Sequence, residues 1–166
     1  MSLPRETLEA QMTLQLDVEP QQIVPGLWTT GEITSRSEAM GASQRHMVRD
    51  GTGWISDPYW DDMALVIEGT GGLILLCGCC HAGLLNTLSH VRRRFDRDPV
   101  AILGGTHLAG ASDEHLRHLV EVLLEIGSPA LHLNHCTGDG ACRALARAFG
   151  DRVSPCPAGT QISYGR

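Results

Sequence analysis

The sequence predicts an α/β fold built on a mixed sheet with helices on one face. Three observations predict it: continuous apolar segments of strand length, segments between them with apolar residues at helical spacing, and glycine-rich turns. Alternation of this kind is typical of α/β layers with right-handed crossovers. Since 166 residues are enough for one compact core, we expect a single domain overall.

The first part of the chain, residues 1–60, is weakly periodic and rich in turn formers. Short strand-like pieces lie at LQLDV (14–18) and LWTTGEI (27–33). We therefore expect residues 1–60 to form an irregular segment with short strands, and residues 61–166 to form the βα layer.

The pattern changes at Asp61. MALVIEG (63–69) and GGLILLCGC (71–79) are continuous apolar strands, and the glycine-rich turn between them predicts a hairpin. Strands that are apolar on both faces need cover on both sides.

Two strand–helix units follow the hairpin. AGLLNTLSHVRRRF (82–95) has helical spacing and leads into the apolar strand PVAILGGTH (99–107). A second helix runs from an N-cap at Ser112 to Gly127, and ALHLNH is the next strand. A third helix is predicted at GDGACRALARAFG (138–150), and the tail around PAGT predicts two short strands.

The composition argues against nucleic-acid and membrane partners. The net charge is −6 and all 13 basic residues are arginine, with one cluster at 92–94 that we interpret as a solvated helix face. Without an extended basic face, nucleic acid is a poor candidate partner. No apolar run is long enough to span a bilayer and no signal peptide opens the chain, so we expect a cytoplasmic protein with no membrane partner and reduced cysteines.

Three histidines share one kind of position. His81, His107 and His135 each follow an apolar strand, and the carboxyl ends of strands are where open α/β sheets bind ligands. Since neighbouring strands lie about 5 Å apart, the three could converge on one metal ion. Imidazole suits zinc, iron or manganese, and a thiolate from Cys79 or Cys136 would favour zinc.

A structural role is the alternative for each of these histidines, because one histidine at a strand end is more often an ordinary hydrogen-bonded group. The other five histidines are interpreted as structural or solvent-facing: His46, His90, His115, His118 and His132. Three cysteines are most simply small buried apolar residues: Cys77, Cys142 and Cys156.

Four motifs occur together in order: DDMALVIEGTGGLILLCGCCHAGLLN, ILGGTHL, LNHCTGDGA and PAGTQISY. In this combination the chain resembles the branch of the metallo-β-lactamase superfamily labelled dihydropterin-methyl-ribofuranosyl-aminobenzene-phosphate synthase. Segment 20–38 is also similar to that branch. The superfamily signature His-x-His-x-Asp-His does not occur in these 166 residues, so the resemblance covers only the later part of a full member.

The resemblance implies a fold and a site. The chain corresponds to the C-terminal half of an αββα sandwich, with His81, His135 and Cys79 as candidate ligands of a divalent metal, zinc first and iron or manganese as alternatives. His107 is a ligand or substrate-facing group and, with Asp62, a candidate catalytic residue. Cys80 stands where the branch has serine. Asp62 is equally well explained as a polar residue at the start of a strand.

Three hypotheses follow. The first is the C-terminal part of a metal-dependent hydrolase in which metal-bound water attacks a small-molecule substrate, with little or no activity without the N-terminal half. The second is a non-catalytic domain for dimerisation or partner binding. The third is a separate metal or thiol site, which requires Cys79, Cys80 and Cys136 to converge. Because the uncovered sheet face is apolar, we expect a second copy, a separate N-terminal chain or residues 1–60 to cover it.

Overall fold

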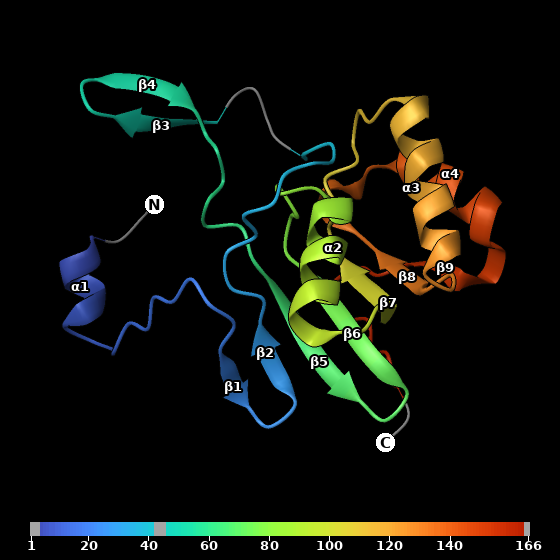
Figure 1. Cartoon of the computed structure of the whole chain (residues 1–166), viewed down its shortest axis with the longest axis horizontal. Coiled ribbons are helices and arrows are strands. Elements are labelled where there is room, and N and C mark those ends of the chain that lie inside the picture. The colour runs from blue at the N-terminus through green and yellow to red at the C-terminus, as the bar shows by residue number, and fades with distance from the viewer. Residues whose placement is uncertain (1–3, 42–45, 165–166) are drawn as a thin grey trace.

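The computed structural model describes residues 4–41 and 46–164 and is built on one seven-stranded sheet (Figure 1). In sheet order the strands are β1 (Gln22–Val24), β2 (Leu27–Thr29), β5 (Ala64–Gly69), β6 (Gly72–Cys77), β7 (Pro99–Gly104), β8 (Ala130–Leu133) and β9 (Val153–Pro155). Pairing is antiparallel from β1 to β6 and parallel from β6 to β9. The predicted mixed sheet and the hairpin at residues 69–72 are confirmed.

Three helices cover one face of this sheet: α2 (Leu84–Phe95), α3 (Asp113–Glu125) and α4 (Asp139–Phe149) (Figure 1). One apolar core joins them to the alternate sheet residues that point toward them. Its fully buried members include Val66, Leu75, Ile102, Leu131, Leu119 and Leu145. The predicted placement of helices on one face is therefore confirmed, and residues 22–29 add two strands to the same sheet.

The remaining elements are short. Helix α1 (Arg5–Glu9) and the separate hairpin of β3 (Met47–Asp50) and β4 (Gly53–Ser56) extend away from the body of the molecule (Figure 1). Two 3₁₀ turns, η1 (His135–Thr137) and η2 (Gly150–Arg152), flank α4.

Local sequence signals account for most element boundaries. The Ser112 side chain accepts a hydrogen bond from the His115 backbone N–H at 3.1 Å, which confirms the predicted N-cap of α3. The tail prediction is wrong in part, because β9 is a strand but residues 156–164 are not. The predicted strand at 14–18 is also absent.

A buried amide fastens the segment before residue 42 to α2. Asn86, 1% exposed, accepts from the Glu38 backbone N–H and donates to the Glu38 carbonyl, both at 2.9 Å. It also donates to the Ala82 carbonyl. Because every polar atom of this amide is paired, the segment is held against the start of α2, next to the strand ends that form the candidate site.

The sheet face away from the helices is only partly covered. Leu65, Ile67, Leu76 and Leu103 are half-buried there. A polar contact closes part of this face, where His132 bonds Ser154 Oγ at 2.7 Å and Tyr164 Oη at 2.6 Å. The segment after β9 thus returns across the outer face.

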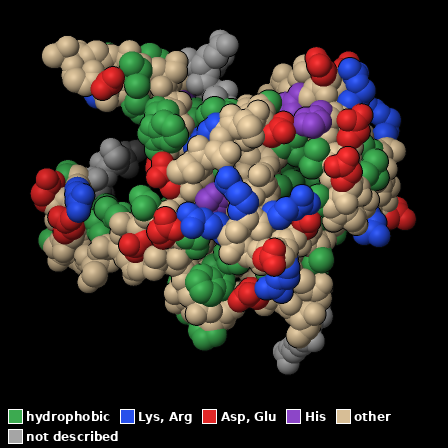
Figure 2. Space-filling model, viewed as in Figure 1, with side chains coloured by type: hydrophobic (Ala, Val, Ile, Leu, Met, Phe, Trp, Pro, Cys, Tyr) green, Lys and Arg blue, Asp and Glu red, His purple; other side chains and the backbone are tan. Residues whose placement is uncertain are grey.

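Charged side chains of both signs are interspersed on the face shown in Figure 2. The predicted arginine cluster at the end of α2 is solvated and ion-paired, with Arg92 bound to Asp98 and Arg94 to Glu19. Among the described residues, no helix combines the length and hydrophobicity needed to cross a membrane.

Buried His90 makes stability depend on pH. Its Nε2–H donates to the Thr30 carbonyl at 2.9 Å, and burial, reinforced by Arg94 and Arg93, lowers its pKa. The unfolded chain therefore binds the extra proton first, and the free energy of unfolding should fall as pH drops below about 6.5. Urea unfolding between about pH 7.5 and 5.5 should show this loss, and a smaller loss in His90→Gln. An equal loss in both proteins would contradict this role for His90.

Candidate metal centre at the strand ends

The parallel strands β6, β7 and β8 end at one edge of the sheet. Their register aligns Cys77 with Gly104 and Gly104 with Leu133. The residues that follow each strand must therefore emerge side by side. This edge gathers Cys79, His107 and His135, which follow three different strands.

The potential metal ligands that meet most closely at this edge are Cys79, His135 and Cys136. One ligand atom from each lies within 4.8 Å of the others. Cys79 and Cys136 are half-buried and His135 is exposed. The Cys136 thiol donates weakly to the Cys79 carbonyl at 3.4 Å. Burial, followed by the neighbouring Cys79, raises the pKa of Cys136 to about 11, so without a cation this thiol is neutral at neutral pH.

His81 lies in a second group, a stack of aromatic and imidazole rings. Its ring lies on the Tyr59 ring with centroids 4.2 Å apart and an interplanar angle of 20°. His107 lies 4.6 Å from His81 on another side. The Tyr59 hydroxyl bonds His46 Nδ1 at 2.8 Å. Of the predicted ligands, Cys79 and His135 therefore meet with Cys136, whereas His81 meets Tyr59 and His107.

Two members of this stack are not predicted from the sequence. His46 is expected to be structural or solvent-facing, but its ring lies 6.0 Å from His81. Tyr59 belongs to no motif, and the signal that the sequence offers is its place just before the apolar strand that begins at residue 64.

His107 carries an unsatisfied buried nitrogen. Its Nδ1 has no hydrogen-bond partner and is inaccessible to solvent. Burial, then the proximity of His81, His46 and His135, lowers its pKa, while Asp62 opposes this weakly. The neutral imidazole is the form that can bind a metal or accept a proton.

Backbone conformations that side chains rarely adopt gather at this edge. Tyr59, Cys80, His107 and His135 all have positive φ, between 46° and 59°. Such conformations cost free energy and persist where the surroundings impose them, which is typical of functional sites. Three of these four residues, Tyr59, His107 and His135, also belong to the ring stack or to the ligand group.

Hydrogen bonds and one glycine hold the loops together. The Thr106 backbone N–H and hydroxyl both reach Thr137 Oγ1, at 3.2 and 3.0 Å. At Gly105, an added Cβ would lie 2.5 Å from the Gly78 carbonyl oxygen and 2.8 Å from Cys136 Sγ. Only glycine therefore lets the loops after β6 and β8 approach each other here.

The two remaining candidates have structural contacts. Asp62 accepts from the Ala82 backbone N–H at 2.7 Å and so ties the start of β5 to the loop after β6. Cys80 is 3% exposed, and its thiol lies 3.3 Å from the Thr87 hydroxyl on α2. The convergence of three cysteines required by the third hypothesis is therefore absent, because only Cys79 and Cys136 meet.

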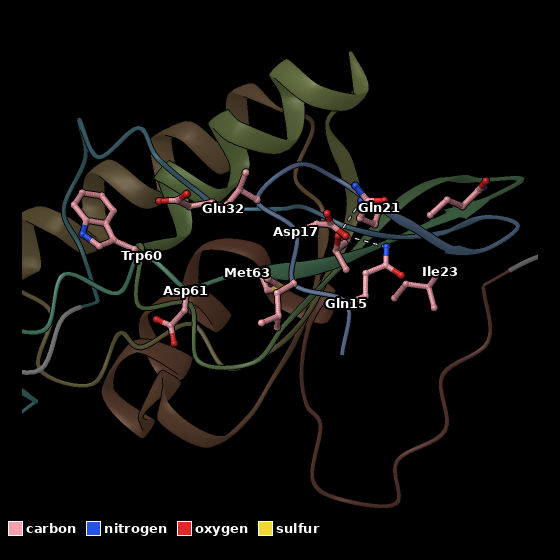
Figure 3. Close-up of a pocket in the computed structure, with 12 residues that line it drawn as sticks. Gln15, Asp17, Gln21, Ile23, Glu32, Trp60, Asp61 and Met63 are labelled. Atoms are coloured by element: carbon pink, nitrogen blue, oxygen red, sulfur yellow. Dashed lines mark hydrogen bonds between the residues drawn. The ribbon is translucent and has the colours of Figure 1, made fainter. Parts of the chain in front are cut away.

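Two hollows adjoin on this side of the molecule. One, of about 400 Å³, is bordered by His46, Tyr59, Asp62, Cys79 and His81 among others. A larger one, of about 570 Å³, lies outside the cysteine and histidine groups, between residues 15–23 and Trp60–Met63 (Figure 3). Asp61 and Met63 line both. The smaller hollow is the one that reaches the candidate ligands.

Comparisons with known proteins agree with this architecture. A solved structure of a metal-dependent hydrolase of the β-lactamase superfamily superimposes with a TM-score of 0.79 over 94% of this chain and 59% of the hydrolase, at 22% identity. This chain has part of the metallo-β-lactamase fold. The fold class predicted from the sequence is thereby confirmed. No family model matches the chain.

Two curated proteins of Methanocaldococcus jannaschii are similar in sequence. One is 7,8-dihydropterin-6-methyl-4-(β-D-ribofuranosyl)-aminobenzene-5'-phosphate synthase, 26% identical over 154 residues, covering 90% of this chain and 52% of the synthase. The other is an uncharacterized protein, 27% identical over 143 residues, covering 86% of this chain and 52% of that protein. The resemblance to the synthase branch is confirmed. The chain spans about half the length of these relatives.

The donor set at the strand ends fits a divalent metal. Two sulfur atoms and an imidazole are the ligand types that zinc prefers, and three protein ligands leave a position open. The buried Nδ1 of His107 is a further donor without a protein partner.

A methyl group at position 105 tests the close approach of the loops. Gly105→Ala should destabilise the fold by about 1–3 kcal/mol, because the Gly78 backbone and the Cys136 side chain must move apart. Urea unfolding measures the change. Gly140→Ala is the matched control, since an added Cβ there meets nothing within 4 Å. Equal stability of the two variants would contradict the packing described here.

Proposed function

We propose that this chain forms the C-terminal part of a metal-dependent hydrolase site of the metallo-β-lactamase type. The observation that carries the proposal is the convergence of Cys79, His135 and Cys136 at the ends of parallel strands, beside the His81–His107 pair. The solved hydrolase with the same fold supports it. A divalent metal bound here would polarise the substrate and lower the pKa of bound water toward about 7.

The residues of the chain divide into two roles in this proposal. Cys79 and His135 hold the cation. His81 and His107 face the substrate, and His107 is suited to moving a proton because its imidazole is neutral and its Nδ1 is unpaired. Asp62 positions the loop through its bond to the Ala82 N–H.

The hollow of about 400 Å³ has the size of a small-molecule site. Its border combines the Tyr59 and His81 rings with the carboxylates of Asp57, Asp61 and Asp62. The similar synthase and the similar hydrolase are named for different reactions. The proposed chemistry is therefore limited to metal-assisted attack on a small molecule.

A partner polypeptide is part of the proposal. The outer sheet face is half-buried and apolar, and the β3–β4 hairpin exposes Met47, Trp54 and Ile55. A two-stranded hairpin is marginal in water by itself, so these surfaces favour cover by a second copy or by a chain that carries His-x-His-x-Asp-His. Such a partner would also add metal ligands.

Metal content tests the proposed centre. The purified chain loaded with Zn²⁺ and desalted should retain about one equivalent, and the double variant Cys79→Ser, His135→Ala should lose it, because two ligands disappear. Elemental analysis measures both. Cys156→Ser with His118→Ala is the matched control and should retain the metal. Absence of metal from the unsubstituted chain would favour the non-catalytic, partner-binding alternative.

Molar mass and turnover test the need for a partner. Light scattering should give the mass of a dimer for the isolated chain if a second copy covers the sheet. Hydrolysis of phosphodiesters and lactones by the chain alone should be slow, because the proposed centre is incomplete. A monomer that binds no apolar dye and turns over substrate rapidly would contradict this part of the proposal.

A further inference from the structure

The proposed function names Cys136 among the converging residues but assigns the cation only to Cys79 and His135. The Cys136 Sγ belongs to the group whose ligand atoms lie within 4.8 Å of one another. Its thiol donates weakly to the Cys79 carbonyl at 3.4 Å, and it also has hydrogen bonds with the His107 backbone and the Cys79 side chain. A sulfur so placed can exchange these contacts for a metal bond.

We propose that Cys136 is the third ligand of the centre and that two thiolates make it selective for thiophilic cations. The proposal rests on the function proposed above and specifies its metal. Zinc, cadmium and cobalt accept sulfur and imidazole donors in tetrahedral sites, whereas manganese prefers oxygen. The centre is therefore a Cys₂His site that discriminates against Mn²⁺.

The local backbone is built for this arrangement. The 3₁₀ turn η1 (His135–Thr137) presents two adjacent residues, His135 and Cys136, as ligands, and His135 adopts a φ of 50° to do so. The Thr137 hydroxyl fixes this turn to the loop after β7. Gly105 supplies the space, since any larger residue would collide with Cys136 Sγ.

His81 is the competing third ligand, and its contacts argue against that role. Its ring is stacked on Tyr59 at 4.2 Å and packed beside His107 at 4.6 Å. Among the described residues it is not part of the group that meets within 4.8 Å. To join the cation it would have to leave the Tyr59 ring, whereas Cys136 is already in place.

Binding of the cation has a defined proton balance. Two metal–sulfur bonds form, and each thiol that carries a proton before binding breaks its S–H bond and passes that proton to the solvent. His135 binds through a neutral ring nitrogen and releases none when the imidazole is already neutral. No electron is transferred, so the step needs no oxidant or reductant.

Cobalt is the probe that tests the ligand set, because thiolate–cobalt bonds give charge-transfer absorption whose intensity grows with the number of sulfur ligands. The full chain should bind one Co²⁺ with absorption for two thiolates. Cys136→Ser and Cys136→Ala should lose about half of that absorption and bind at least about tenfold more weakly. Zn²⁺ should displace the cobalt, and excess Mn²⁺ should not.

Controls separate this inference from the function it rests on. Cys142→Ser, on α4, and His81→Ala should keep the full absorption. In the unsubstituted chain, Cd²⁺ should protect both Cys79 and Cys136 from alkylation, a measurement that needs no variant to fold. Cobalt binding with unchanged absorption in the Cys136 variants would overturn the inference and leave the metal centre standing. No cobalt binding by the unsubstituted chain would overturn both.

Discussion

Parallel pairing of β6, β7 and β8 is the constraint on which the rest of the structure depends. Parallel strands need a crossover between them, so α2 and α3 must lie on the sheet and bury one face. The same pairing sends each carboxyl end to one edge. The loops after the three strands therefore meet, and the side chains of residues 79, 107 and 135 become neighbours in space although they are distant in the sequence.

Hydrogen bonds fix the loops at this edge of the sheet. Reciprocal bonds of Asn86 fasten the segment around Glu38, and Thr106 with Thr137 joins two of the loops. Positive φ at His107 and His135 stores strain that the packed core can sustain. These contacts hold the loops that carry the candidate ligands in a fixed arrangement.

Chemically the edge divides into a sulfur-rich side and a ring-rich side. Cys79 and Cys136 offer soft donors next to His135, while His81 lies between Tyr59 and His107. The first group suits a cation and the second suits a substrate or a proton in transit. The outer sheet face is only partly covered in this chain, which spans about half the length of its curated relatives.

The sequence by itself determined the order of strands and helices from residue 61 to residue 155, because apolar periodicity, the Ser112 N-cap and the glycine turns are local signals. It also offered the strand-end histidines His81, His107 and His135, with Cys79 or Cys136 as a thiolate ligand. Tertiary structure alone decided that Cys79, His135 and Cys136 meet and that His46 and Tyr59 lie beside His81. Those contacts depend on loop conformations with positive φ and on the space at Gly105, which arise only when distant strands pair.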